Sequence, residues 1–285
     1  MITLENIIEK IEYLPPFPQA VTKVMQMMKD PNTSPEEIAE VVKYDQAIAT
    51  NVLRLCNSSY CGLRRTISNL REAVVFIGMK NLKNIMIISG TQKYFDKENP
   101  GYETKKGELW IHALAVSIIA GNIGEKINIK NKDELFIAAL LHDIGKLVLN
   151  EYVLESCVEI SNTIEKEDLT FLDAEKKVLG MNHAEIGAKV LDIWKFPEEI
   201  ISAVRKHHSA YDENDTDLEN MVRIADNLAM MMGYETGVDG LAYNGFSDIC
   251  RRYDLNRGIM DNIMSDSLEE IVKIETEYRI SMEVQ

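Results

Sequence analysis

The amino-acid sequence predicts an all-α protein in which a multi-helical N-terminal lobe is packed on a second helical lobe that carries a polar site. Apolar residues recur with the spacing of one helix face in segment after segment, and no stretch shows the strict alternation and turn pairs of β-strands. A long apolar run from Leu135 to Leu149 carries an imidazole and a carboxylate in its middle, at His142 and Asp143. Such a pair is costly inside an apolar helix unless its burial is compensated, and a bound metal ion is the usual compensation.

Length and composition indicate a globular protein. The chain has 285 residues, of which 46% are apolar, so it can bury a large core in one or two domains. Its net charge of −15, with no long basic run, argues against nucleic acid and anionic membranes as partners. The four cysteines form no CxxC motif and imply no disulfide framework. The N-terminus does not resemble a signal peptide, and no stretch reaches the ~20 apolar residues of a transmembrane helix, so we expect a soluble cytoplasmic protein.

The N-terminal lobe, residues 1–99, is expected to be a series of helices. A proline-rich break at residues 15–18 separates the first two, a capping box at residues 34–37 opens the third, and Gly78 closes the fifth. Residues 57–65 are expected to form a loop. The helical spacing predicts helices over residues 4–13, 19–29, 34–42, 46–56, 68–77 and 81–95.

A charged stretch with Pro and Gly at residues 96–106 has the composition of a linker, and we place a lobe boundary there. A second lobe, residues 104–234, and a C-terminal extension, residues 235–285, follow it. The extension is expected to begin with a looser stretch to Asn244 and to continue as two or three short helices, which either pack across the second lobe or form a dimer contact. In the second lobe the spacing predicts helices over residues 107–126, 132–150, 153–166, 170–179, 182–194, 197–208 and 217–234.

Polar residues on these otherwise apolar helices are expected to converge in one pocket. All five histidines of the chain lie in the second lobe, and Asp226 follows on a strongly apolar helix. Imidazole and carboxylate without thiolate suit Mn, Fe, Zn, Ni or Co better than a structural zinc site. Two such ions can activate a water and hold a phosphate for in-line displacement, with Asp143 and Lys146 as catalytic candidates. The predicted metal ligands are Glu108, His112, His142, Asp143, His183, His207, His208 and Asp226.

Each of these residues alone has a simpler interpretation. A single histidine on an amphipathic helix is usually a hydrogen-bonded core or surface residue, a His-His pair before a polar loop is often solvated, and Asp226 fits a surface charge. The His-Asp pair in an apolar run, together with every other histidine of the chain, favours a common site.

The order of these polar residues resembles that of the HD superfamily of metal-dependent phosphohydrolases. Glu108 and Lys146 fall where the HD-GYP branch has an extra carboxylate ligand and a conserved lysine. Residues 14–211 as a whole resemble an HDOD domain, the HD-related output domain of bacterial signalling proteins. The features that carry this second resemblance are Leu14-Pro15-Pro16, Asp45 before the helix 47–55, Asn57-Ser58 with Tyr60 and Gly62, and Ile77-Gly78 followed by Leu82.

The two resemblances imply different functions. HDOD proteins are mostly regulatory or scaffolding modules, whereas HD-GYP proteins hydrolyse cyclic di-GMP. No GYP motif follows His207 and His208, where the sequence reads SAYDENDTDLEN. We therefore expect a bacterial signal-transduction module that binds one or two ions of Fe, Mn, Ni or Zn, has other signalling proteins as partners and lacks strong catalytic activity. The alternative is a metal-dependent phosphohydrolase that binds a nucleotide or phosphodiester at the metal site.

Overall fold

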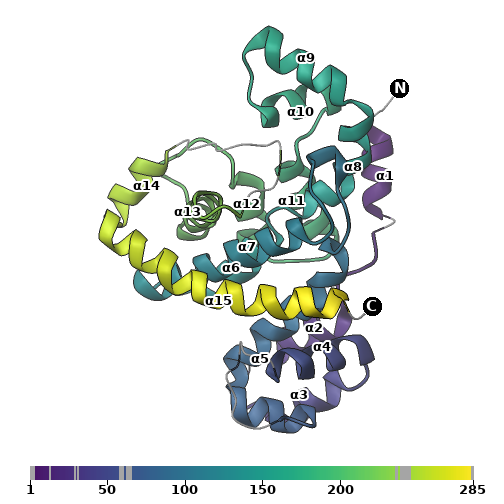
Figure 1. The fold of residues 1–285 in the computed structure, drawn as a ribbon, viewed down its shortest axis with the longest axis vertical. Helices are drawn as coiled ribbons and strands as arrows, with labels where there is room; N and C mark the ends of the chain where they lie inside the picture. The colour runs from purple at the N-terminus through teal and green to yellow at the C-terminus, as the bar shows by residue number, and fades with distance from the viewer. Residues whose placement is uncertain are drawn as a thin grey trace. The chain divides into compact units, whose positions relative to one another are not determined.

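The computed structural model describes residues 4–12, 14–28, 30, 32–57, 61, 66–234, 237 and 245–283. Within these ranges the regular structure is helical (Figure 1), apart from one isolated β-bridge between Asn99 and Thr104. The predicted all-α class is therefore confirmed. Most of the predicted loop at residues 57–65, including Ser58, Tyr60 and Gly62, lies outside the described residues, as does most of the looser stretch up to Asn244.

The chain divides into two compact units. One unit contains residues 1–14 and 94–267, and the other contains residues 15–93 and 268–285. The division into domains at residues 1–99, 104–234 and 235–285 remains a prediction.

The unit of residues 15–93 and 268–285 begins with four helices whose ends are set by local signals. They are α2 (Gln19–Met27), α3 (Pro35–Val42), α4 (Gln46–Cys56) and the first part of α5 (Leu70–Phe95). The predicted capping box of α3 is present, because Ser34 accepts from the Glu37 N–H while the Glu37 carboxylate accepts from the Ser34 N–H. Gly78 has the non-helical angles φ 77° and ψ 162° and breaks α5 into two parts whose axes are bent by 116°. The helix end predicted at Gly78 is therefore present.

The other unit holds the polar site on a set of packed helices. Helix α6 is buried along most of its length and packs on α7 and α13, while α11 packs on α8 and α12. The elements are α1 (Leu4–Glu12), η1 (Pro100–Tyr102), α6 (Glu108–Lys126), α7 (Lys132–Leu141), α8 (Ile144–Glu155), α9 (Cys157–Glu167), α10 (Phe171–Leu179), α11 (His183–Ile193), α12 (Glu198–Lys206), α13 (Asp217–Met231), α14 (Phe246–Arg252) and the start of α15 (Arg257–Glu283).

Three predicted helix boundaries are wrong. The break expected between residues 150 and 153 lies instead at Ser156, between α8 and α9. The helix expected over residues 132–150 is two helices, because α7 ends at Leu141 and α8 begins at Ile144, with Asp143 at the non-helical angles φ −95° and ψ 10°. The extension after α14 is one helix of 27 residues, α15, instead of short helices only. Along α15 buried residues recur every three or four positions, Ile263 and Ser267 in the unit of residues 94–267 and Ile271, Ile274 and Tyr278 in the other unit.

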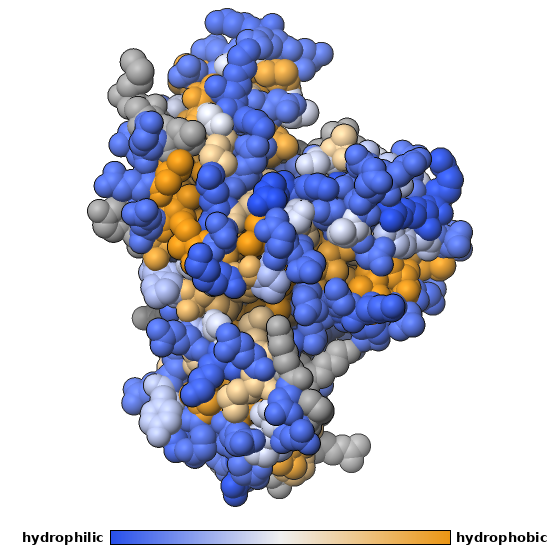
Figure 2. Space-filling view, turned by 180° about the vertical axis from the view of Figure 1, so that it is seen from behind, coloured by the Kyte–Doolittle hydropathy of each residue, from blue (hydrophilic) through white to orange (hydrophobic). Residues whose placement is uncertain are grey.

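No described helix is by itself long and apolar enough to cross a membrane. Among the helices of the described residues, only the two halves of α5, which are bent against each other, reach the length and composition together. Figure 2 shows hydrophilic side chains over much of the face in view, with smaller hydrophobic areas between them. Large apolar side chains that are more than half exposed include Tyr44, Val75 and Val158.

Candidate metal centre

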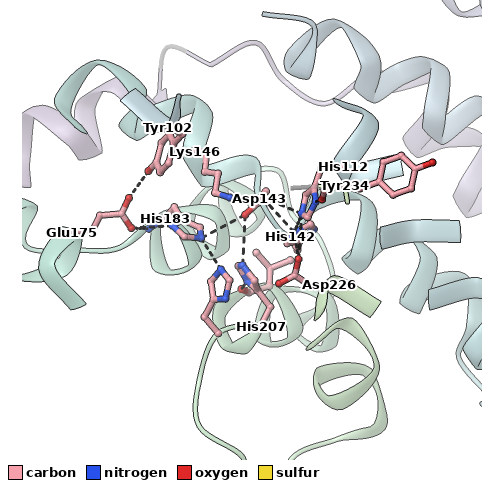
Figure 3. Close-up of polar contacts among 12 residues, drawn as sticks. Tyr102, His112, His142, Asp143, Lys146, Glu175, His183, His207, Asp226 and Tyr234 are labelled. Carbon is pink, nitrogen blue, oxygen red and sulfur yellow. Dashed lines mark hydrogen bonds and ion pairs between the residues drawn. The ribbon is translucent and has the colours of Figure 1, made fainter. Parts of the chain in front are cut away.

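The fold brings together all the predicted ligands except Glu108. They come from α6, the junction of α7 and α8, the start of α11, the end of α12 and the middle of α13. Every one of these side chains is at most 3% exposed except His208, which is half-buried. The cluster consists of His112, His142, Asp143, His183, His207, His208 and Asp226 (Figure 3).

A close crossing of α8 and α11 places Asp143 beside His183. A Cβ atom on Gly145 would lie 1.9 Å from the His183 carbonyl oxygen and 2.7 Å from the Gly187 nitrogen. Only a glycine therefore allows the two backbones to approach this closely. The crossing leaves Asp143 Oδ1 3.5 Å from His183 Nε2.

One half of the cluster, which we call subsite A, consists of His112, His142, Asp226 and the Oδ2 atom of Asp143. The Nε2 atoms of His112 and His142 are 3.1 Å apart and lie 3.6 and 3.5 Å from Asp143 Oδ2. Asp226 Oδ1 is 3.2 Å from His112 Nε2 and 3.7 Å from His142 Nε2. Ligand atoms from three helical segments thus surround one small volume.

The other half, subsite B, consists of His183, His207, His208 and the Oδ1 atom of Asp143. Asp143 Oδ1 lies 3.5 Å from His183 Nε2 and 3.7 Å from His207 Nε2, and the Nε2 atoms of His183 and His208 are 3.1 Å apart. One ligand atom from each of these four residues lies within 4.8 Å of the others. Figure 3 shows Asp143 between the two histidine sets, so its carboxylate faces both subsites.

The hydrogen bonds of the imidazoles orient their Nε2 atoms toward the cluster. Nδ1 of His112 lies 2.7 Å from the Tyr234 carbonyl oxygen, Nδ1 of His142 lies 2.7 Å from that of Ala139, and Nδ1 of His207 lies 2.6 Å from that of Val204. A carbonyl only accepts, so each Nδ1 carries a proton, and whenever the ring is neutral its Nε2 lone pair faces the cluster. Facing lone pairs on His112 and His142 require a cation or a further proton between them.

The unsatisfied atoms of the site fit a divalent metal ion. Asp143 Oδ1 and His207 Nε2 are buried and have no hydrogen-bond partner. Buried polar atoms without a partner are costly, and a coordinated cation removes this cost for both atoms. Imidazole nitrogens with carboxylate oxygens are donors that Zn, Fe, Mn and Ni accept. The histidines and aspartates of the cluster therefore fit the predicted metals, Fe, Mn, Ni and Zn.

Electrostatic interactions keep the carboxyl groups of the site ionised. Burial opposes the charged form of Asp143, but the Lys146 ammonium and the nearby imidazoles outweigh it and hold the pKa of that carboxyl well below its usual range. Burial likewise opposes ionisation of Asp226, but the hydrogen bond with His112 lowers its pKa. Burial lowers the pKa of His142 to about 4, whereas for His112 the carboxylate of Asp226 outweighs burial and raises the pKa.

Glu175 is a functional candidate that the sequence did not reveal. It lies on α10, is fully buried, and accepts hydrogen bonds from the His183 N–H at 2.7 Å, from His183 Nδ1 at 3.0 Å and from the Tyr102 hydroxyl. For His183 this carboxylate outweighs the effect of burial and raises the imidazole pKa. Glu175 is one of many acidic residues on amphipathic helices, and its partner His183 is brought to it by the turn between α10 and α11, so no sequence signal marked it.

The two remaining predicted residues lie in different surroundings. The Lys146 ammonium is 1% exposed, lies 2.7 Å from Asp143 Oδ2 and sits over the Tyr102 ring at 5.6 Å. Glu108 is exposed at the first turn of α6, where its carboxylate accepts from the Lys105 N–H at 2.7 Å. The structure does not bring Glu108 to the cluster.

Comparisons with curated proteins give two distant relatives. The chain is 23% identical over 208 residues to an uncharacterized protein of Treponema pallidum, covering 72% of this chain and 39% of that protein. It is 25% identical over 166 residues to ribonuclease Y of Mycoplasmoides gallisepticum, covering 57% of this chain and 24% of that protein. The chain thus spans less than half the length of these curated relatives.

Solved structures share the fold. An HDOD domain protein of unknown function from Geobacter sulfurreducens has a TM-score of 0.74 at 23% identity, covering 95% of this chain and 97% of that one. A protein from Shewanella amazonensis, provisionally named a metal-dependent phosphohydrolase, has a TM-score of 0.63 at 21% identity, covering 94% and 96%. The family model of the HDOD domain matches residues 14–210. Because this match spans well over half of the chain, the protein belongs to the HDOD domain family.

Proposed function

We propose that the protein is a regulatory module of bacterial signal transduction whose buried cluster binds one or two divalent transition-metal ions without strong catalytic activity. The observation that carries the proposal is that the cluster is buried and yet contains ligand atoms that lack a hydrogen-bond partner. All cluster side chains except His208 are at most 3% exposed, yet Asp143 Oδ1 and His207 Nε2 have no hydrogen-bond partner. A cation would satisfy both atoms and would be shielded from solvent.

The charge of the cluster supports a bound cation. Three buried carboxylates, those of Asp143, Glu175 and Asp226, stand against one buried ammonium, that of Lys146. With neutral imidazoles this leaves an excess of two negative charges, which equals the charge of one divalent ion. Uncompensated charge in a protein interior is costly, so ion binding would stabilise the folded lobe.

Enclosure favours a structural or sensory ion over a hydrolytic one. A catalytic metal site keeps an open coordination position for water or substrate, whereas a structural site is closed by protein ligands. Only His208 offers a partly exposed ligand here. The helical surface would then deliver the output to other signalling proteins, and Fe, Mn, Ni or Zn would supply charge neutralisation and rigidity.

The first test is the metal content of the purified protein by elemental mass spectrometry. We expect one or two equivalents in the wild type and none in a His142→Ala, Asp143→Ala double variant. Glu167→Gln removes an exposed carboxylate that pairs with Lys177 on the surface, and this control is expected to retain the metal. A metal-free wild type, after growth with each metal and purification without chelator, would reject the metal centre. Partner capture that persists in a folded double variant would support a signalling role independent of the metal.

A second candidate function is a metal-dependent phosphohydrolase acting on a nucleotide or phosphodiester. The specific observation in its favour is that the two oxygens of Asp143 face different histidine sets, as a carboxylate shared by two ions would. Lys146 could hold the carboxylate in place or contact a phosphate. Phosphodiester and nucleotide substrates with Mn or Fe test this function, and turnover no higher than that of the double variant would exclude it.

A further inference from the structure

The two subsites differ in what lies behind their histidines. In subsite A, Nδ1 of His112 and of His142 bonds to a neutral backbone carbonyl. In subsite B, Nδ1 of His183 bonds to the carboxylate of Glu175 at 3.0 Å. A carboxylate behind a ligating imidazole fixes its tautomer and orientation and makes it a stronger electron donor to a cation than a carbonyl does.

Glu175 is itself held rigidly. One carboxylate oxygen accepts from the Tyr102 hydroxyl, and the other accepts from both the backbone N–H and Nδ1 of His183. Tyr102, Glu175 and His183 are all fully buried (Figure 3). The bond to the His183 N–H also satisfies a free donor at the first residue of α11, where the positive end of the helix dipole would otherwise disfavour a nearby cation. Glu175 thus fixes both the backbone and the ring of His183.

The shared carboxylate of Asp143 is also asymmetric. Its Oδ2 atom, which faces subsite A, already lies 2.7 Å from the Lys146 ammonium. Its Oδ1 atom, which faces subsite B, has no hydrogen-bond partner, and neither has His207 Nε2 in the same subsite. Each subsite also has one pair of facing Nε2 atoms at 3.1 Å, His112 with His142 in subsite A and His183 with His208 in subsite B, but in subsite A Asp226 Oδ1 lies 3.2 Å from His112 Nε2. The two ligand atoms of the cluster that have no hydrogen-bond partner therefore both lie in subsite B.

We infer that subsite B holds its ion more tightly than subsite A, and that Glu175, supported by Tyr102, is the positioning residue responsible. This inference rests on the proposed metal centre. Glu175 is not a ligand in this scheme, because its oxygens are used by Tyr102 and His183; it acts through the ring of His183.

The test is a titration of the metal-free full-length protein with Co²⁺, followed by visible absorption and calorimetry. Wild-type protein is expected to take up a first equivalent tightly, and His112→Ala is expected to keep it. Glu175→Gln keeps the size of the side chain but removes its charge, and we expect it to weaken the first equivalent by about 10- to 100-fold and to change its absorption bands. Tyr102→Phe should weaken it less, and Glu167→Gln should leave it unchanged.

The outcomes distinguish a failure of this inference from a failure of the proposed metal centre. No Co²⁺ uptake by the wild type would reject the metal centre and the inference together. Uptake in the wild type, loss of the first equivalent in His112→Ala and unchanged affinity in Glu175→Gln would overturn the inference alone. If circular dichroism shows that Glu175→Gln does not fold, Tyr102→Phe decides: unchanged affinity and spectrum overturn the role of the Tyr102–Glu175 pair, and a weakened first equivalent supports it.

Discussion

Replacing Gly145 with alanine should damage both the stability of the fold and the cluster. The added Cβ would lie 1.9 Å from the His183 carbonyl oxygen and 2.7 Å from the Gly187 nitrogen, both well inside van der Waals contact. Both atoms belong to the backbone, so no side-chain rotation relieves the clash. Helices α8 and α11 would have to separate by more than 1 Å, judged from an ordinary contact of about 3.5 Å between carbon and oxygen.

The size of the effect follows from two opposing contributions. Overpacking in a core costs about 1–3 kcal/mol, and occasionally more. Alanine gains up to ~1 kcal/mol over glycine in a helix interior, but Gly145 is the second residue of α8, so this gain offsets only a small part of that cost. We expect a net loss in the free energy of unfolding of about 1–2 kcal/mol, or a fall in Tm of about 2–8 °C for a protein of this size. Separation of the helices also lengthens the 3.5 Å approach of Asp143 to His183, so metal content should fall.

The assay is thermal unfolding by circular dichroism together with elemental analysis. Gly121→Ala is the matched control, because a Cβ there would meet only Phe136, at an ordinary contact distance of 3.9 Å, within helix α6. We expect this control to be neutral or slightly stabilising. An unchanged Tm and metal content for Gly145→Ala would refute the role assigned to the α8–α11 crossing.

Three further predictions concern other parts of the protein. Asp215 and Arg223 are each 2% exposed and form an ion pair at 3.2 Å, so Asp215→Asn should lower the free energy of unfolding by about 3–5 kcal/mol in urea denaturation. Burial opposes ionisation of Asp215, but Lys206, the Asp212 N–H and Arg223 lower its pKa below the usual value. The stabilisation that ionised Asp215 contributes is therefore complete above the unfolded pKa of about 3.9 and is lost as the pH falls through the lower folded pKa. The Asp215→Asn variant should not show this loss in an acid titration. Ser34→Ala should cost about 0.5–2 kcal/mol, measured as a lower urea midpoint, through loss of the α3 cap. A chelator should lower Tm in the wild type, since an ion at 100 times its Kd contributes about 2.7 kcal/mol, and leave the His142→Ala, Asp143→Ala variant unaffected.

Local signals made much of the fold predictable from the sequence. The capping box at Ser34 and the helix end at Gly78 depend on residues within a few positions of each other, and the structure contains both. The break at His142 was not predicted, because the apolar spacing continues on both sides of it. Glu175 escaped prediction because its importance arises only when the turn after α10 brings it against His183.

The break at His142 and the orientation of the ligands have one physical cause. His142 and His207 occupy the C-cap positions of α7 and α12, and each donates Nδ1–H to the carbonyl three residues earlier, Ala139 or Val204. The bond satisfies a carbonyl that the helix end leaves free, and it turns Nε2 toward the cluster. Both helices also direct the negative ends of their dipoles to the cluster, which favours a cation there. A histidine at the C-terminus of an apolar helix therefore ends the helix and supplies an oriented ligand at once, which explains why the apolar run from Leu135 to Leu149 forms two helices that meet at the cluster.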